Sequence, residues 1–221
     1  MKLIQGTLLS FFMGLTLLAC GQQTNRSSRD MKPAVANTAS LSGLSVATFA
    51  SGCFWCVEGV FESVKGVKEA VSGYAGGTEA NPTYEQVSAH VTSHAETVQV
   101  YYDSTQVSYA TLLKVYFASQ DPTQVMGQGP DHGASYRSII FYRNAAEKMQ
   151  AQNYIASIQK DFKKPIAAEL EPFTKFWNAE GYHQNYIVNN PGVSYVQFES
   201  IPRIKRFQKK FPDLIKSDRK L

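Results

Sequence analysis

The chain has 221 residues, with 22 Lys and Arg against 18 Asp and Glu and a formal net charge of +4. This mild charge gives no reason to expect nucleic-acid binding. Three cysteines are too few for a disulfide framework or a four-thiolate zinc site. From the length and composition we expect one ordinary soluble domain behind an N-terminal extension, and we expect it to act as a monomer.

The N-terminus has the pattern of a secretory signal. Lys2 precedes an apolar run over residues 7–19, which is too short for a good membrane span. The residues LLACG at 17–21 resemble a bacterial lipobox, in which the leader is removed before the cysteine and the cysteine is acylated. The resemblance implies a lipoprotein signal peptide over residues 1–19, a lipid on Cys20, and anchoring in the bacterial cell envelope outside the cytoplasmic membrane. The alternative is an ordinary signal peptide in which Cys20 is incidental.

A polar segment separates this leader from the folded part of the chain. Residues 21–44 are mostly Gln, Asn, Ser, Thr, Arg and Ala, which bury too little apolar surface to offset the entropy of ordering. We therefore expect a flexible tether over residues 20–44 and one folded domain over residues 45–221. The domain ends in a basic helix, because four apolar residues recur there at helical spacing: Ile204, Phe207, Phe211 and Leu214.

The first third of the domain predicts a strand, a helix and a second strand. Residues 46–51 are apolar and favour a strand, and residues 54–64 place Val57 and Val60 at helical spacing. Residues 67–74 form another strand-like run, which ends in the turn residues AGG. Together these elements make one β-α-β unit.

The same order follows again further along the chain. Residues 96–103 alternate apolar and polar side chains, Ser108 caps a helix, and residues 138–142 are a short apolar strand. Asn144 caps one more helix, and residues 165–172 alternate as a last strand. Two split β-α-β units predict an α+β fold, a ferredoxin-like two-layer α/β sandwich with extended loops.

Cys53 and Cys56 stand where the first strand turns into the first helix, in the sequence SGCFWC. Amide N–H groups and the positive end of the helix dipole favour a thiolate at such a position. We therefore expect Cys53 to be a nucleophile and Cys56, one turn further on, to be a resolving thiol. The alternative is a buried, inert pair.

The motif GCFWCVE around these cysteines resembles the signature of the A-type peptide methionine sulfoxide reductases. Further motifs follow in the family's order and approximate spacing, from about residue 48 to the tail: GYAGG (73–77), NPTY (81–84), HAE (94–96), DP (121–122), GPDHG (129–133) and YRS (136–138). Singly these motifs are weak evidence, but the ordered set is strong. The resemblance implies thiol-dependent reduction of methionine S-sulfoxide, free or in proteins, and hence repair of oxidised proteins.

The resemblance also assigns catalytic roles. Cys53 attacks the sulfoxide sulfur and becomes a sulfenic acid, which Cys56 resolves as a disulfide. Glu96 protonates the departing oxygen, which requires an apolar site that keeps its carboxyl protonated. Tyr84 and Tyr136 donate hydrogen bonds to the same oxygen. On the residues alone, Glu96 could equally be an exposed strand residue and the two tyrosines core aromatics.

The substrate and the reductant have their own expected contacts. Phe54 and Trp55 form a slot for the substrate methyl group, and Asp131 helps to hold the substrate backbone, although Asp131 could also be a simple turn residue. A thioredoxin-like dithiol would return the enzyme to its reduced form. No cofactor and no metal are expected. His183 lies in GYHQNY, which resembles a family segment near the site, but the sequence assigns it no role.

The chain departs from the family pattern in two places. Many members have Gly at the position of Cys56 and resolve the sulfenic acid with distal cysteines, of which this chain has none. Ser93 stands where Gly is common, which leaves the backbone angles of that loop open. Two other classes also stay open: a thioredoxin-like dithiol exchanger, and a metal-binding envelope lipoprotein that uses the thiols and histidines.

Overall fold

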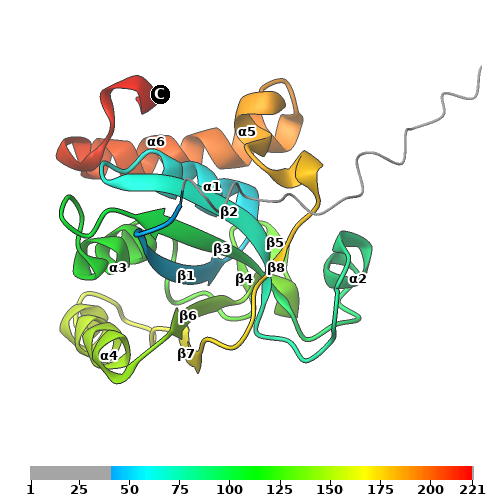
Figure 1. Cartoon of the computed structure of the whole chain (residues 1–221), viewed down its shortest axis with the longest axis horizontal. Coiled ribbons are helices and arrows are strands. Elements are labelled where there is room, and N and C mark those ends of the chain that lie inside the picture. The colour runs from blue at the N-terminus through cyan, green and yellow to red at the C-terminus, as the bar shows by residue number, and fades with distance from the viewer. Residues whose placement is uncertain (1–40, 221) are drawn as a thin grey trace, which may run out of the picture.

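The computed structural model describes residues 41–220 (Figure 1). The predicted signal peptide, Cys20 and nearly all of the predicted tether lie outside the described residues. The first strand, β1 (Ser45–Ser51), starts where the folded domain was expected to start. Within residues 41–220 there is no helix whose length and apolar character would let it span a membrane.

A six-stranded sheet forms the centre of the domain, in the order β7-β6-β1-β3-β2-β8 (Figure 1). The other five strands are β2 (Val67–Ala75), β3 (Ala95–Tyr102), β6 (Ser138–Tyr142), β7 (Glu169–Pro172) and β8 (Trp177–Asn178). The four central strands β6, β1, β3 and β2 pair antiparallel with one another, and the edge strand β7 pairs parallel with β6. Two interleaved β-α-β units give this order, so the predicted ferredoxin-like α+β fold is confirmed.

The longer helices follow the caps that the sequence predicts. The helices are α1 (Phe54–Glu62), α2 (Tyr84–Ser88), α3 (Tyr109–Ala118), α4 (Ala145–Gln159), α5 (Tyr186–Asn189) and α6 (Ile201–Lys210). The side chains of Ser108 and Asn144 accept N–H bonds from the first turns of α3 and α4. Each cap satisfies an amide that the helix itself leaves unpaired.

The main core lies between the sheet and α1 and α3. Phe49 of β1 stacks on Phe61 and on Tyr116, with ring centroids 5.2 Å apart in both pairs. Helix α6 packs against α1 and α3, and Figure 1 shows it running alongside α1. A smaller cluster that includes Ile139 and Phe141 covers part of the other sheet face. The site's scaffold is therefore a rigid sheet with α1 held between the sheet and α6.

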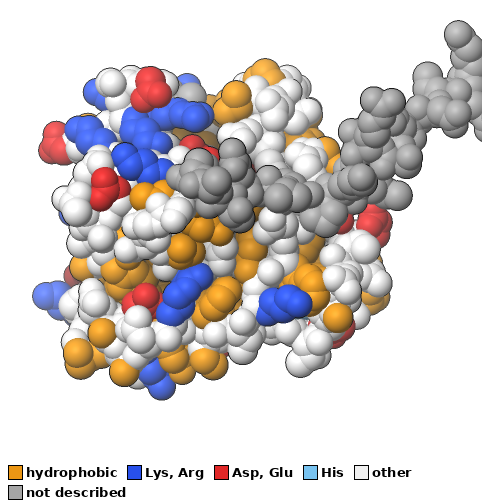
Figure 2. Space-filling view, viewed as in Figure 1, with side chains coloured by type: hydrophobic (Ala, Val, Ile, Leu, Met, Phe, Trp, Pro, Cys, Tyr) orange, Lys and Arg blue, Asp and Glu red, His pale blue; other side chains and the backbone are white. Residues whose placement is uncertain are grey.

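Two predicted elements are shorter than expected. The strand expected over residues 165–172 is confined to Glu169–Pro172, because the amide of Ala167 donates to the carbonyl of Pro122 instead of joining β6. Helix α6 ends at Lys210, before Phe211, because a residue that precedes proline is disfavoured in the helical conformation. Figure 2 shows Lys and Arg side chains gathered over this C-terminal region.

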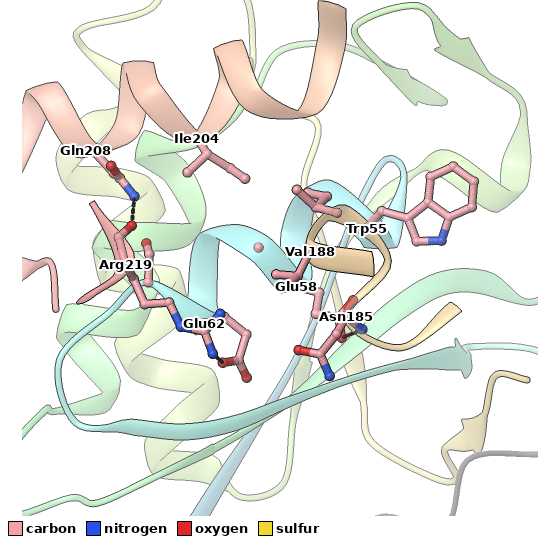
Figure 3. Close-up of a pocket in the computed structure, with 11 residues that line it drawn as sticks. Trp55, Glu58, Glu62, Asn185, Val188, Ile204, Gln208 and Arg219 are labelled. Atoms are coloured by element: carbon pink, nitrogen blue, oxygen red, sulfur yellow. Dashed lines mark hydrogen bonds and ion pairs between the residues drawn. The ribbon is translucent and has the colours of Figure 1, made fainter. Parts of the chain in front are cut away.

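Glu58 is a buried carboxyl that ties α1 to the rest of the domain. It accepts hydrogen bonds from the Asn185 amide (2.8 Å) and from the Ser72 hydroxyl (3.2 Å). Glu58 and Asn185 line a small pocket of about 80 Å³ beside α1 (Figure 3). Burial raises the pKa of the Glu58 carboxyl to about 8. Glu58 therefore joins α1 to β2 and to the segment before α5, which is a structural part.

Glu58 makes the stability of the domain fall as the pH rises. The folded carboxyl titrates near 8 and the unfolded one near its ordinary value, so the folded state binds the extra proton between these two values. Relative to Glu58→Gln, the wild-type free energy of unfolding should fall by at most about 1.4 kcal/mol per pH unit from about pH 5 to pH 8. Urea unfolding at three pH values measures this, with exposed Glu85→Gln as the control. Parallel curves for wild type and Glu58→Gln would contradict it.

Candidate active site

The turn from β1 into α1 places both thiols. Gly52 has φ of +70°, and a Cβ there would lie 2.5 Å from the Cβ of Gln128, so glycine alone fits. Cys53 is the N-cap residue of α1, and its carbonyl accepts the amide of Cys56. Both thiols are free, with 6% of Cys53 and 2% of Cys56 exposed. The predicted pair therefore sits at a helix start, but it is buried.

Glu96 lies beside this helix start. It is the second residue of β3 and is 2% exposed, and its carboxyl accepts the backbone N–H of Phe54 at 2.9 Å. The pKa of this carboxyl is raised to about 8, mainly by burial and also by the negative side chain of Asp131, while the bond from Phe54 acts in the opposite direction. The carboxyl is therefore mostly protonated at neutral pH, which is the environment that the predicted acid role requires.

The two thiols share a hydrogen bond and titrate together. Burial raises the pKa of Cys53, and the neighbouring Cys56, Glu96 and Asp131 act in the same direction. The bond from Cys53 lowers the pKa of Cys56 to about 6, helped by Arg203. Burial therefore opposes the effect that the helix start was expected to have on Cys53, and the role of Cys53 as the nucleophile stays a prediction. A negative charge on Cys56 is therefore favoured relative to an ordinary cysteine.

The two predicted tyrosines lie around the same sulfur from different loops. Tyr84 begins α2, and Tyr136 ends a short 3-10 turn before β6. Burial raises the pKa of each phenol, and the charges of Glu96 and Cys53 raise both pKa values further. Both hydroxyls therefore keep their protons at neutral pH and can donate hydrogen bonds to an oxygen placed near Cys53.

Asp131 belongs to a short hairpin of β4 (Gly127–Gln128) and β5 (Asp131–His132). Its carboxylate accepts a short hydrogen bond from the hydroxyl of Tyr195, a residue that the sequence analysis did not single out. Asp131 acts electrostatically on both Cys53 and Glu96. The hairpin thus brings a carboxylate to the edge of the site, and Tyr195 orients it.

The two aromatic residues between the thiols have different surroundings. Phe54 is 1% exposed and packs against Tyr84 and His183. Trp55 is half-buried, stacks on Tyr186 with centroids 3.7 Å apart, and donates its indole N–H to His183 at 3.0 Å. Trp55 is therefore the one of the two with surface left to offer to a substrate.

Glu180 and His183 support the site, although sequence reasoning gave neither a role. Glu180 accepts the amide of Tyr84 (3.0 Å) and the hydroxyl of Tyr74 (2.8 Å), which fixes the start of α2. His183 is 1% exposed, and burial lowers its pKa to about 4, so it is neutral and can accept the bond from Trp55. Only the family-like GYHQNY segment pointed here, and the contacts could not be read from it.

The histidines near the site serve the backbone of its loops. His94 accepts the Gly77 amide with one ring nitrogen and donates to the Glu79 carbonyl with the other, so neither nitrogen is free for a metal. Within the described part of the chain, no three His, Cys, Asp or Glu side chains converge on a point that could hold a metal ion.

Ser93 is not in the left-handed region, and its hydroxyl donates to Glu79, so the loop accommodates serine.

A buried thiol pair, a protonated carboxyl and two phenols around one sulfur define the class of a thiol-dependent oxidoreductase. The family model described as peptide methionine sulfoxide reductase matches residues 45–215. Peptide methionine sulfoxide reductase MsrA 1 of Rhodopirellula baltica is 44% identical over 178 residues, which cover 80% of this chain and 93% of that protein. The MsrA of Acinetobacter baumannii is 46% identical over 171 residues, covering 77% and 98%.

Solved structures agree with these relatives. Reduced Mxr1 of Saccharomyces cerevisiae matches with a TM-score of 0.63 and 30% identity, over 68% of this chain and 87% of that one. Methionine sulfoxide reductase A of Corynebacterium diphtheriae matches with a TM-score of 0.62 and 31% identity, over 68% and 76%. The chain belongs to the peptide methionine sulfoxide reductase family.

Replacing His183 should loosen Trp55. His183→Phe keeps a ring against Phe54 and removes the acceptor of the indole N–H, so a buried bond is lost. We expect KM for a methionine sulfoxide peptide to rise by about threefold to tenfold, the effect of losing about one hydrogen bond. In a Trp177→Phe background, Trp55 emission should shift to longer wavelength. Unchanged KM and emission would show that the bond does not position Trp55.

Proposed function

We propose that this methionine sulfoxide reductase acts on the S epimer, free and in proteins, with Cys53 as nucleophile, Glu96 as acid and Cys56 as resolving thiol. The observation that carries the proposal is the bond from the Phe54 amide to Glu96. It places a protonated carboxyl at the same helix start as Cys53. A thioredoxin-like exchanger has no need of such an acid.

The reaction balances with these groups. The Cys53 sulfur attacks the sulfoxide sulfur, and the thiol proton that it loses replaces the proton that Glu96 gives to the oxygen. Glu96 protonates the oxygen, with Tyr84 and Tyr136 donating to it. The sulfur–oxygen bond of the substrate breaks, methionine leaves, and Cys53 holds the oxygen as a sulfenic acid.

The surroundings of the site suit a sulfoxide with a small methyl group. The half-buried face of Trp55 and the phenols of Tyr84 and Tyr136 offer apolar surface and donors together. In this proposal Asp131 accepts a backbone amide of a bound peptide, and the bond from Tyr195 that orients its carboxylate supports this role. Reduction of separate S and R epimers with dithiothreitol tests the proposal. Turnover of R at a rate equal to that of S would contradict it.

The two cysteines should separate in a single turnover without reductant. Cys53→Ser should form no methionine. Cys56→Ser should form one methionine per chain and lose one thiol, whereas wild type should form one methionine and lose two thiols, because a disulfide follows the sulfenic acid. Amino-acid analysis and thiol counting measure these values. If Cys56→Ser forms no methionine, its assigned role as the resolving thiol is wrong.

If Glu96 is the acid, its replacement should slow the reaction, and the wild-type rate should fall at alkaline pH. Glu96→Gln should slow single-turnover methionine formation by about two to four orders of magnitude. The wild-type rate should fall about tenfold per pH unit above pH 8, because the protonated carboxyl is lost there. Glu58→Gln is the matched control, because the Glu58 carboxyl titrates in the same range but lies away from the sulfur. The rate of this variant should still fall above pH 8. If the rate of Glu96→Gln also falls about tenfold per pH unit above pH 8, the assignment of Glu96 as the acid is ruled out.

We also propose that the enzyme is a lipoprotein of the cell envelope, recycled there by a thioredoxin-like dithiol. The lipobox-like LLACG supports this proposal, and the missing distal cysteines leave the Cys53–Cys56 disulfide as the only species to recycle. Thiols outside the cytoplasm are not kept reduced by the cytosolic pool, so an envelope reductant is needed.

Fractionation tests the anchor. Wild type should go to membranes with an acylated Cys20, and Cys20→Ala should fail to mature by acylation and should leave the membrane fraction. Membrane association of a processed, unacylated Cys20→Ala would contradict the lipoprotein proposal. That result would leave the catalytic proposal intact, because the site lies wholly within residues 41–220.

A further inference from the structure

Cys56 has a second set of contacts, from the C-terminal part of the chain, that the sulfoxide step does not use. Its thiol donates to the hydroxyl oxygen of Ser200, with the sulfur 3.2 Å from that oxygen. Ser200 is completely buried and ends a π-helical turn, Val196–Ser200, directly before α6. A hydroxyl at this distance can turn its proton toward a thiolate sulfur and stabilise the negative charge.

Arg203 supplies a fixed positive charge behind this contact. It is 8% exposed, and its guanidinium donates to the Ser119 carbonyl (2.6 Å) and to the carbonyl and hydroxyl of Ser51 (3.1 and 2.8 Å). None of these three acceptors is a carboxylate, so they hold the side chain in place without neutralising it. Its charge therefore remains available to attract a thiolate on Cys56.

Tyr195 is the other hydroxyl near Cys56, but its single proton is already committed. The phenol donates to Asp131, so it can serve the thiolate only by giving up that bond. Ser200 has no such conflict with Asp131. Of the two hydroxyls near Cys56, Ser200 is therefore the one able to donate to the thiolate throughout the cycle.

We propose that Ser200 is a positioning residue for the resolving step, which holds Cys56 as a thiolate aimed at the Cys53 sulfur, with Arg203 as the fixed charge. This inference rests on the proposed function, in which Cys56 resolves the sulfenic acid. It also assigns different groups of one buried site to different steps of the reaction. Glu96 and the two tyrosines serve the oxygen of the substrate, and the C-terminal segment serves the second sulfur.

The resolving step balances as follows. The Cys56 thiolate attacks the sulfur of the Cys53 sulfenic acid, a disulfide bond forms, and the sulfur–oxygen bond of Cys53 breaks. The oxygen takes up a proton from solvent and leaves as water. Cys56 lines a pocket of about 350 Å³, together with Asp131, Tyr195 and Arg203.

Several charged groups face Cys56 besides Ser200. The nearest titratable or charged ones come from α1, β3, β5, the segment before α6, and α6 itself: Cys53, Glu96, Asp131, Tyr195 and Arg203. The pocket adds two acids, Asp121 and Glu199, and two bases, Arg206 and Lys210, whose charges cancel. None of these groups changes in Ser200→Ala, so a pH shift in that variant reports the hydroxyl.

Ser200→Ala tests the inference in a single turnover with methionine S-sulfoxide and no reductant. Methionine formation should stay within about twofold of wild type. Disulfide formation should slow by about fivefold to tenfold at pH 6 and by less than twofold at pH 9, because the loss of one bond to the thiolate raises its apparent pKa by about one unit. Dimedone should trap the accumulated sulfenic acid at pH 6.

Two further variants separate charge stabilisation from packing. Ser63→Ala removes a buried hydroxyl, bonded to the Val60 carbonyl at the far end of α1, and should resolve as fast as wild type. Ser200→Thr restores a hydroxyl and should recover the rate at pH 6. When the thiolate is titrated by its ultraviolet absorbance, only Ser200→Ala should show an apparent pKa higher than that of wild type.

The outcomes that would overturn the inference are distinct from failure of the proposed function. The role of Ser200 in holding a thiolate is wrong if Ser200→Ala forms the disulfide at the wild-type rate at pH 6. It is also wrong if disulfide formation in this variant slows equally at pH 6 and pH 9. If wild type itself forms methionine but no disulfide, the resolving role of Cys56 is wrong. That result would be seen before any Ser200 variant is compared.

Discussion

The hydrogen bond from the Phe54 amide to the Glu96 carboxyl is the interaction on which the site depends. It joins the first turn of α1, which carries the thiols, to the start of β3, which carries the acid. The sheet order makes this possible, because β1 and β3 are neighbours and β1 runs directly into α1. Gly52 completes the junction, since no side chain fits between the turn and Gln128.

Burial of this junction acts on its two reactive groups in opposite ways. A dry site keeps Glu96 protonated, as a general acid requires, but it also disfavours a thiolate on Cys53. A surface helix end contributes only about 0.3–1 kcal/mol to an anion, whereas burying an isolated charge costs several kcal/mol. Part of this cost is offset at Cys56, where the charge of Arg203 and the hydroxyl of Ser200 favour a thiolate.

The segment from Glu180 to Arg203 provides most of the support for the site, although only short parts of it are helical. Gln184 pairs with both backbone groups of Ser72 in β2, which fixes the segment to the sheet edge. From there His183 holds Trp55, and Ser200 contacts Cys56. A chain without distal cysteines thus uses its C-terminal segment to orient residues of the first helix rather than to supply a sulfur.

The sequence by itself determined the ferredoxin-like fold, the caps of α3 and α4, and the motif residues that gather around Cys53. These follow from local periodicity, from capping chemistry and from ordered motifs, which survive in a linear string. Only the tertiary structure decided how burial acts on the two thiols, and that Glu180, His183, Tyr195, Ser200 and Arg203 belong to the site. Those outcomes depend on burial and on contacts between residues as many as 152 positions apart, such as Ser51 and Arg203. Desolvation depends on everything packed around a group, and no spacing along the chain records it.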